Sequence, residues 1–188
     1  MDLQPTELSL WSEHGYFCRD GLLGDDGVAL VRAAVADAVF APAQVVGAAA
    51  GIRGDELAWL DRTPSLAPLW DALDGLARAA ARVRFLGLSD RVEVQLARYR
   101  GDGGGYARHR DAVAGALGPG RRLTCIYYLN DGWRAEHGGA LRLYPAAPTP
   151  VELGPIADRA VVFLSGEIEH EVLSSLRPRL AVTSWYYA

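Results

Sequence analysis

From Arg91 to the end of the chain, short apolar runs alternate with turn residues, and this pattern limits the folds that the chain can adopt. The runs are rich in β-branched and aromatic side chains, which favour strands over helices. Short strands at this spacing are typical of a sandwich or a barrel of antiparallel sheets. We therefore predict a jelly-roll core over residues 91–188.

Residues 1–90 carry a mainly helical pattern instead. Apolar side chains recur at intervals of three and four over residues 25–40 and 66–85, as in helices that pack through one face. Such helices would support one face of the jelly roll, so the fold class that we expect is α+β. The other elements predicted here are a helix over 6–14, strands over 16–19 and 56–60, and a loop over 46–51.

The chain fits a single domain over residues 1–188. A length of 188 residues with 50% hydrophobic content is enough for one well-filled core and too little for two ordinary domains. No stretch approaches the roughly 18 apolar residues of a membrane span, and the first residues lack the features of a signal peptide. We therefore expect a cytoplasmic protein that does not enter the membrane.

The sequence contains no lysine, since all 19 of its Lys and Arg residues are arginine. This excludes Schiff-base enzymes, pyridoxal phosphate enzymes and phosphate loops that need a lysine. The formal net charge of −4 argues against nucleic acid as the main partner. With only four histidines and two cysteines, an active site must draw on few residues.

Two of those histidines and one aspartate form a pattern suited to a metal. His109 and Asp111 stand two positions apart, so in an extended strand both side chains point to the same face. His170 follows a later apolar strand. Two histidines and one carboxylate on one side of a cavity are the facial ligand set of non-haem Fe(II). The alternative is a surface histidine on a strand and an unrelated loop histidine.

The last predicted strand begins with Arg179. If its face points inward, the buried guanidinium requires an anionic partner such as a carboxylate. If it points outward, Arg179 is an ordinary exposed arginine. Tyr128 and Tyr99 could donate hydrogen bonds to the same ligand, or they could be ordinary core tyrosines. Alternation places these residues on the face of Arg179: Ala181, Thr183 and Trp185.

Several segments resemble the Fe(II)- and 2-oxoglutarate-dependent prolyl hydroxylases, in the branch of the hypoxia-inducible-factor prolyl hydroxylases and their bacterial counterparts. They are YARHRDA, RRLTCIYYLNDGW, GGALRLYP and HEVLSSLRPRLAVTSWYY. The resemblance continues in HGYFCRDGLLG and IRGDELAW, so it spans nearly the whole chain. It implies that the jelly roll is a double-stranded β-helix.

The resemblance also implies roles for single residues. His109, Asp111 and His170 would be the iron ligands, and Arg179 would form a salt bridge with the distal carboxylate of 2-oxoglutarate. Arg177, the nearby rival for that salt bridge, is expected to lie just outside the strand. Tyr128 would donate to the same carboxylate, Tyr99 would lie near the metal-binding end of the co-substrate, and the pocket would be lined by Ile126, Leu141, Val172, Thr183 and Trp185.

Substrate contacts follow from the same resemblance. Arg121 and the region from Arg53 to Asp55 would face or gate a polypeptide, and residues 61–64 would form a mobile lid. The chain stops after the last strand, so we expect it to lack the C-terminal extension and the zinc finger of the animal enzymes. No role follows for His14 or His137.

The implied reaction uses Fe(II), 2-oxoglutarate and O2, with ascorbate as a further cofactor. It would hydroxylate C4 of a prolyl residue in a protein and release succinate and CO2. One alternative is a hydroxylase of a free amino acid or small secondary metabolite, because substrate class follows the loops rather than the fold. Another is a non-catalytic sensor module that binds metal and 2-oxoglutarate. We expect a monomer.

Overall fold

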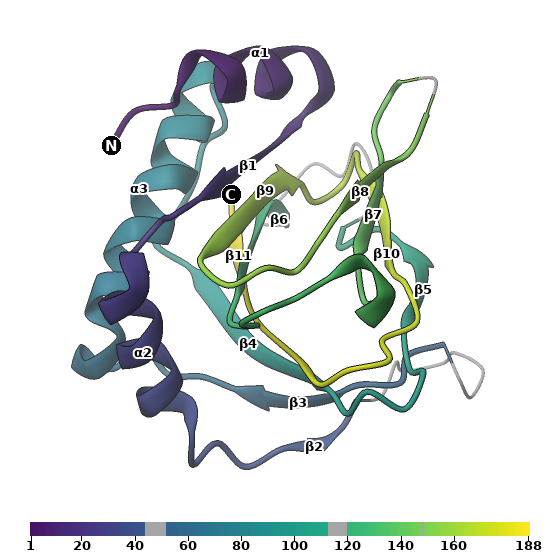
Figure 1. Cartoon of the computed structure of the whole chain (residues 1–188). Helices are drawn as coiled ribbons and strands as arrows, with labels where there is room; N and C mark the ends of the chain where they lie inside the picture. The colour runs from purple at the N-terminus through teal and green to yellow at the C-terminus, as the bar shows by residue number, and fades with distance from the viewer. Residues whose placement is uncertain (44–51, 113–119, 148) are drawn as a thin grey trace.

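The computed structural model describes residues 1–43, 52–112, 120–147 and 149–188. Its strands form two antiparallel sheets (Figure 1). The major sheet has the order β1 (Tyr16–Asp20), β9 (Arg159–Leu164), β6 (Arg121–Tyr128), β11 (Arg179–Tyr187), β4 (Val92–Tyr99), β3 (Glu56–Trp59) and β2 (Ala41–Pro42). The minor sheet has the order β5 (Tyr106–His109), β10 (Glu169–Val172), β7 (Leu141–Tyr144) and β8 (Val151–Leu153).

The two sheets face each other, and the helices lie on the opposite side of the major sheet (Figure 1). This arrangement confirms the α+β fold class with a double-stranded β-helix core and N-terminal supporting helices. No helix among the described residues is long and apolar enough to cross a membrane. The helices are α1 (Pro5–His14), α2 (Gly24–Val35) and α3 (Ala67–Arg84), with short 3₁₀ turns η1 (Pro64–Leu66) and η2 (Ala135–His137).

Helix α3 joins the helices to the major sheet. Its Leu69, Leu73 and Leu76 are fully buried, as the spacing of three and four predicts. On α1, the Trp11 indole is also fully buried and donates a hydrogen bond to the Ala80 carbonyl at 2.9 Å. Burial of each such side chain contributes roughly 1.5–3 kcal/mol, so this layer holds the major sheet firmly in place.

Helix α2 is shorter than the sequence pattern predicts. It ends at Val35, whereas the pattern indicated a helix as far as Phe40. The chain leaves the helix because Ala41–Pro42 pairs with β3 as the edge strand β2. Phe40 packs beneath the Arg98 guanidinium of β4, 3.9 Å from the ring centre. Contacts with the sheet therefore override the helical pattern at this end.

One segment, residues 52–59, connects the two sheets and is called the crossing segment below. Its first part bonds to the minor sheet, where the Gly54 N–H donates to the Gly105 carbonyl at 2.8 Å. Its second part is β3, which pairs with β4 of the major sheet from Glu56 to Trp59. The loop predicted over 46–51 lies outside the described residues.

Candidate metal and co-substrate site

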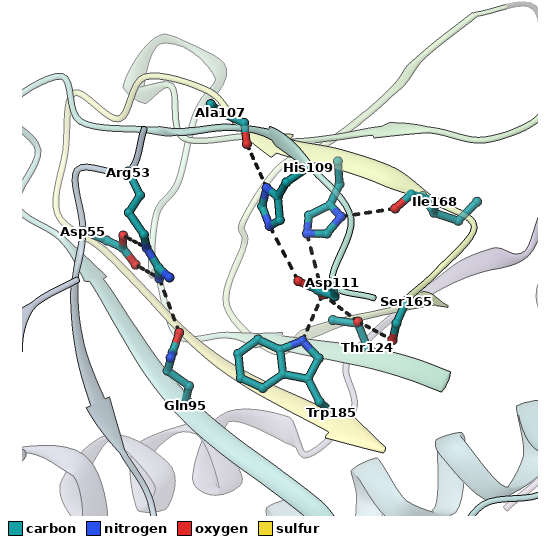
Figure 2. Close-up of polar contacts among 11 residues, drawn as sticks. Arg53, Asp55, Gln95, Ala107, His109, Asp111, Thr124, Ser165, Ile168 and Trp185 are labelled. Carbon is teal, nitrogen blue, oxygen red and sulfur yellow. Dashed lines mark hydrogen bonds and ion pairs between the residues drawn. The ribbon is translucent and has the colours of Figure 1, made fainter. Parts of the chain in front are cut away.

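Three potential metal ligands meet between the sheets. β5 and β10 pair antiparallel, with His109 directly opposite His170. One ligand atom from each of His109, Asp111 and His170 lies within 4.8 Å of the others. The Nε2 atom of His109 is 3.6 Å from Asp111 Oδ1, and that of His170 is 3.8 Å from Asp111 Oδ2 (Figure 2).

Asp111 reaches the cluster in a way that strand alternation did not predict. β5 ends at His109, and Asp111 lies in the bend that follows. Its backbone N–H donates to the Ser165 carbonyl at 3.1 Å. Its carboxylate accepts hydrogen bonds from Thr124 Oγ1 at 2.7 Å and Trp185 Nε1 at 2.9 Å (Figure 2). The major sheet therefore orients the carboxylate while the minor sheet carries the two histidines.

The protonation states suit a cation. Burial alone would raise the pKa of Asp111, but His170 and the hydrogen bonds from His109, Trp185 and Thr124 outweigh it and hold that pKa well below its usual range. Burial lowers the pKa of His170, and Asp111 acts in the opposite direction. At neutral pH the cluster therefore offers an ionised carboxylate and a neutral imidazole, the forms that bind metals.

In both histidines, the ring nitrogen Nδ1 faces a backbone carbonyl. His109 Nδ1 lies 2.8 Å from the Ala107 carbonyl, and His170 Nδ1 lies 3.3 Å from the Ile168 carbonyl. Such contacts favour the tautomer with hydrogen on Nδ1, which leaves Nε2 free to bind. Two imidazoles and one carboxylate fit a divalent iron and leave positions for other ligands.

Arg179 is the second chemical centre of the site. It is 4% exposed, and its Nε donates to the Gly139 carbonyl at 2.9 Å. The rings of Tyr99 and Tyr128 lie 5.1 and 5.0 Å from the guanidinium carbon. Among the described residues no carboxylate pairs with this buried cation. A buried, unpaired guanidinium is costly, so the arrangement fits an anionic ligand.

Tyr128 also indicates that an anionic ligand binds beside Arg179. Its side chain is fully buried, and its hydroxyl has no hydrogen-bond partner among the described residues. Burial raises the pKa of Tyr128, with Arg179 acting in the opposite direction, so the hydroxyl keeps its proton and can donate it. An unused donor beside an unpaired cation fits the carboxylate of an anionic ligand.

A cavity of about 530 Å³ contains both centres. It is lined by every residue predicted to contact the metal, the co-substrate or the substrate except Tyr128, whose ring lies 5.0 Å from the Arg179 guanidinium carbon. Arg177 borders a different pocket, so of the two rival arginines only Arg179 faces this cavity. The predicted residues at the cavity are Arg53, Asp55, Tyr99, His109, Asp111, Arg121, Ile126, Leu141, His170, Val172, Arg179, Thr183 and Trp185.

The crossing segment borders the cavity with an ion pair. Arg53 donates two hydrogen bonds to Asp55, both 2.7 Å long (Figure 2). On β6, the Arg121 guanidinium lies 4.0 Å over the Trp185 ring and donates to Glu93 at 3.0 Å. Charged groups on β6 and on the crossing segment therefore line the cavity.

The predicted lid, residues 61–64, does not line the cavity. Arg62 instead donates a 2.8 Å hydrogen bond to Asp74 on α3 and lies 5.5 Å from the Trp70 ring. After β3 ends at Trp59, these contacts of Arg62 hold the segment against α3 rather than at the cavity, so the prediction is wrong for these residues.

Sequence reasoning missed several cavity residues. Trp59, Gln95 and Tyr106 all line the cavity, and none was predicted to do so. Alternation from Tyr99 along β4 would have found Gln95, because the two residues share a face. Tyr106 had no such signal, since its position depends on contacts with the crossing segment. Thr124, whose hydroxyl donates to Asp111, was not predicted to belong to the site either.

Comparisons with known proteins agree with this geometry. Residues 94–187 match the family described as the 2OG-Fe(II) oxygenase superfamily. Human prolyl hydroxylase EGLN3 is 35% identical over 157 residues, which cover 77% of this chain and 64% of the human protein. This chain thus aligns with slightly less than two thirds of that relative's length.

Two solved structures extend the similarity to nearly the whole chain. A Pseudomonas putida prolyl-4-hydroxylase superposes with a TM-score of 0.81 and 33% identity, covering 96% of both chains. A Trichoplax adhaerens prolyl hydroxylase, solved with a hypoxia-inducible-factor peptide, has a TM-score of 0.83 and 28% identity, covering 96% of this chain and 87% of that one. The fold, the ligand cluster and the family match together establish that the chain belongs to the 2OG-Fe(II) oxygenase superfamily.

Proposed function

We propose that this protein is an Fe(II)- and 2-oxoglutarate-dependent dioxygenase that hydroxylates C4 of a prolyl residue in a protein substrate. The observation that carries the chemistry is the unpaired, buried Arg179 in the same cavity as the His109, Asp111 and His170 cluster. The prolyl substrate is supported by the similarity to prolyl hydroxylases from a bacterium and from animals.

The chain's own residues would bind and orient the reactants. His109, Asp111 and His170 would hold iron, while Arg179 and the Tyr128 hydroxyl would hold the distal carboxylate of 2-oxoglutarate. Bound Fe(II) and 2-oxoglutarate supply the oxidation, in which O2 is consumed, 2-oxoglutarate becomes succinate and CO2, and a C–H bond becomes C–OH.

The walls of the cavity would then exclude water and set the co-substrate's direction. Ile126, Leu141 and Val172 supply apolar surface beside the metal cluster, and Tyr99 adds a buried ring near Arg179. Arg53, Asp55 and Arg121 surround the opening and would contact the polypeptide. A requirement for ascorbate stays a prediction.

The test is to incubate the protein with Fe(II), 2-oxoglutarate and proline-containing peptides, and to measure succinate and peptide mass. We expect succinate release that depends on peptide, and a gain of about 16 Da located to a proline. His170→Ala should abolish both, whereas His137→Ala, a histidine outside the cluster, should not. Turnover stimulated only by free amino acids or other small molecules would reject the protein substrate. Binding of 2-oxoglutarate without turnover would reject the enzyme.

A cytoplasmic location is part of the same proposal. It is supported by the two cysteines, which are unpaired in the structure, Cys125 being buried and Cys18 half-buried. Free thiols are typical of the reducing cytoplasm.

A further inference from the structure

The two histidines of the metal cluster are held by different surroundings. His170 is 4% exposed and packs against the core residue Phe163, with ring centroids 4.6 Å apart. His109 packs against Tyr106, with centroids 3.8 Å apart and ring planes inclined by 23°. Phe163 belongs to the hydrophobic core, whereas Tyr106 is only partly buried and borders the cavity. The orientation of the His109 ring therefore depends on Tyr106, a residue that lines the cavity rather than one in the hydrophobic core.

Tyr106 is in turn connected to the crossing segment. The Arg53 guanidinium carbon lies 4.5 Å from the centre of the Tyr106 ring. The backbones of the same two residues form an antiparallel bridge, flanked by the 2.8 Å hydrogen bond from Gly54 to Gly105. Backbone and side-chain contacts thus both join Arg53 to Tyr106, so the ring follows the position of this segment.

A second connection passes through the backbone of β5. The Ala107 N–H donates to the Ile52 carbonyl at 2.8 Å. The Ala107 carbonyl lies 2.8 Å from His109 Nδ1. One residue therefore links the crossing segment to the nitrogen that sets the tautomer of the imidazole.

Arg53 is also fixed by hydrogen bonds at the guanidinium that lies over Tyr106. Its guanidinium makes the paired hydrogen bonds to Asp55, which is 5% exposed, and a longer contact of 3.4 Å to Gln95 Oε1 (Figure 2). Because a bidentate pair of this kind fixes a guanidinium in one plane, Arg53 can hold the Tyr106 ring in place.

We propose that Tyr106 is a positioning residue that fixes the His109 imidazole for the metal, and that Arg53 connects this position to the segment across the cavity mouth. The inference rests on the proposed function, which supplies the metal site. Without the Tyr106 ring, the His109 side chain would have to lose conformational freedom when the metal binds, which lowers the affinity. Loss of contacts that orient a metal ligand commonly weakens metal affinity by about 10–100-fold.

The experiment measures Mn(II) binding by the full-length protein, using the loss of the free Mn(II) signal in electron paramagnetic resonance. Mn(II) alone is the probe, so catalytic turnover does not enter the measurement. Tyr106→Leu should weaken Mn(II) binding by about tenfold. Tyr106→Phe retains the ring and should bind as the wild type does. Arg53→Met should weaken binding less than Tyr106→Leu.

Tyr144→Leu is the matched control. On the same sheet, the Arg108 guanidinium lies 3.7 Å from the Tyr144 ring, so this is the same type of pair. Tyr144 does not line the cavity. Its removal should leave the affinity for Mn(II) unchanged, which separates an effect on His109 from general weakening of the sheet.

Equal Mn(II) affinities for folded Tyr106→Leu and wild type, with folding checked by circular dichroism, would overturn the role of Tyr106. If Tyr106→Leu does not fold, Arg53→Met still tests the link, and an unchanged affinity would overturn it. A wild-type protein that binds no Mn(II) would remove the metal site and the proposed function with it. Prolyl hydroxylation by the wild type, together with unchanged Mn(II) binding by both variants, would reject this inference and leave the proposed function standing.

Discussion

Arg179 is the residue whose surroundings say most about the ligand. The side chain is buried, its guanidinium carbon lies 5.1 and 5.0 Å from the Tyr99 and Tyr128 rings, and its Nε donates to one backbone carbonyl. Because an isolated buried charge is costly, we expect an anionic ligand to pair with the buried Arg179 guanidinium. Arg177, two positions earlier, borders another pocket and provides a natural comparison.

Replacing Arg179 by alanine should therefore raise the KM for 2-oxoglutarate. The expected loss in kcat/KM is on the order of 2–5 kcal/mol, because a desolvated charge pair is removed. Steady-state kinetics with varied 2-oxoglutarate measures it. Arg177→Ala should behave as the wild type, and an equal effect of both variants would contradict the assignment of the anion site to Arg179.

Phe85 has a backbone conformation that residues other than glycine rarely adopt. It ends α3 in the left-handed region, with φ of 53° and ψ of 38°, and its side chain is 93% exposed. Glycine is the usual residue here because a Cβ atom is strained in this conformation. The exposed ring adds no core packing that would offset the strain.

Phe85→Gly should therefore stabilise the protein by about 1 kcal/mol, measured by urea unfolding. Phe85→Ala retains the Cβ atom and is the matched control, with stability expected close to that of the wild type. Equal stabilities of the glycine and alanine variants would show that backbone strain at residue 85 is not the cause.

At the scale of elements, an ion pair joins β3 to β4. Glu56 accepts hydrogen bonds from Arg98 Nε at 3.0 Å and Nη2 at 2.7 Å, and it also pairs with Arg100. The hydrogen bonds from Arg100 and then Arg98 lower the pKa of Glu56 to about 2. Because β3 is part of the crossing segment, this pair helps to hold that segment against the major sheet.

A lowered carboxylate pKa stabilises the folded state above the unfolded pKa near 4.5, and this contribution is lost as the pH falls toward about 2. The melting temperature of Glu56→Gln should thus lie below that of the wild type at pH 7, with a difference that shrinks between pH 4.5 and 2. Scanning calorimetry at several pH values measures this. Glu136→Gln, which removes an exposed carboxylate on η2, should differ little from the wild type. A pH-independent difference for Glu56→Gln would contradict the linkage.

At the scale of the whole molecule, the site depends on both sheets at once. The minor sheet supplies His109 and His170, whereas the major sheet supplies Arg179 and the Thr124 and Trp185 contacts that orient Asp111. Ligands that contact all of these groups would join the two sheets, so binding should stabilise the entire fold.

Mn(II) and 2-oxoglutarate together should raise the melting temperature. At about 100 times its own dissociation constant, each of the two ligands contributes about 2.7 kcal/mol, or roughly 5–10 °C for a chain of this size. Differential scanning fluorimetry measures the shift. In Arg179→Ala, Mn(II) should still raise the melting temperature, whereas 2-oxoglutarate should no longer raise it further. A 2-oxoglutarate shift of equal size in that variant would place the co-substrate elsewhere.

The sequence by itself determined features that follow from local periodicity wherever contacts with distant residues do not intervene. Strand alternation predicted that Arg179, Ala181, Thr183 and Trp185 share a face, and all four line the cavity. Helical spacing located α3 to within two residues of its observed ends. Both predictions succeed because side-chain direction repeats every two residues in a strand and every 3.6 in a helix. The resemblance of several segments to a known family added the double-stranded β-helix.

Tertiary structure alone decided the features that depend on distant neighbours. Strand pairing ended α2 at Val35, turned Asp111 toward Ser165 beyond the end of β5, and directed residues 61–64 to α3 rather than to the cavity. The link from Arg53 to Tyr106 and on to His109 joins residues more than fifty positions apart. Such contacts depend on how the two sheets pack, and the local pattern of a sequence carries no record of that packing.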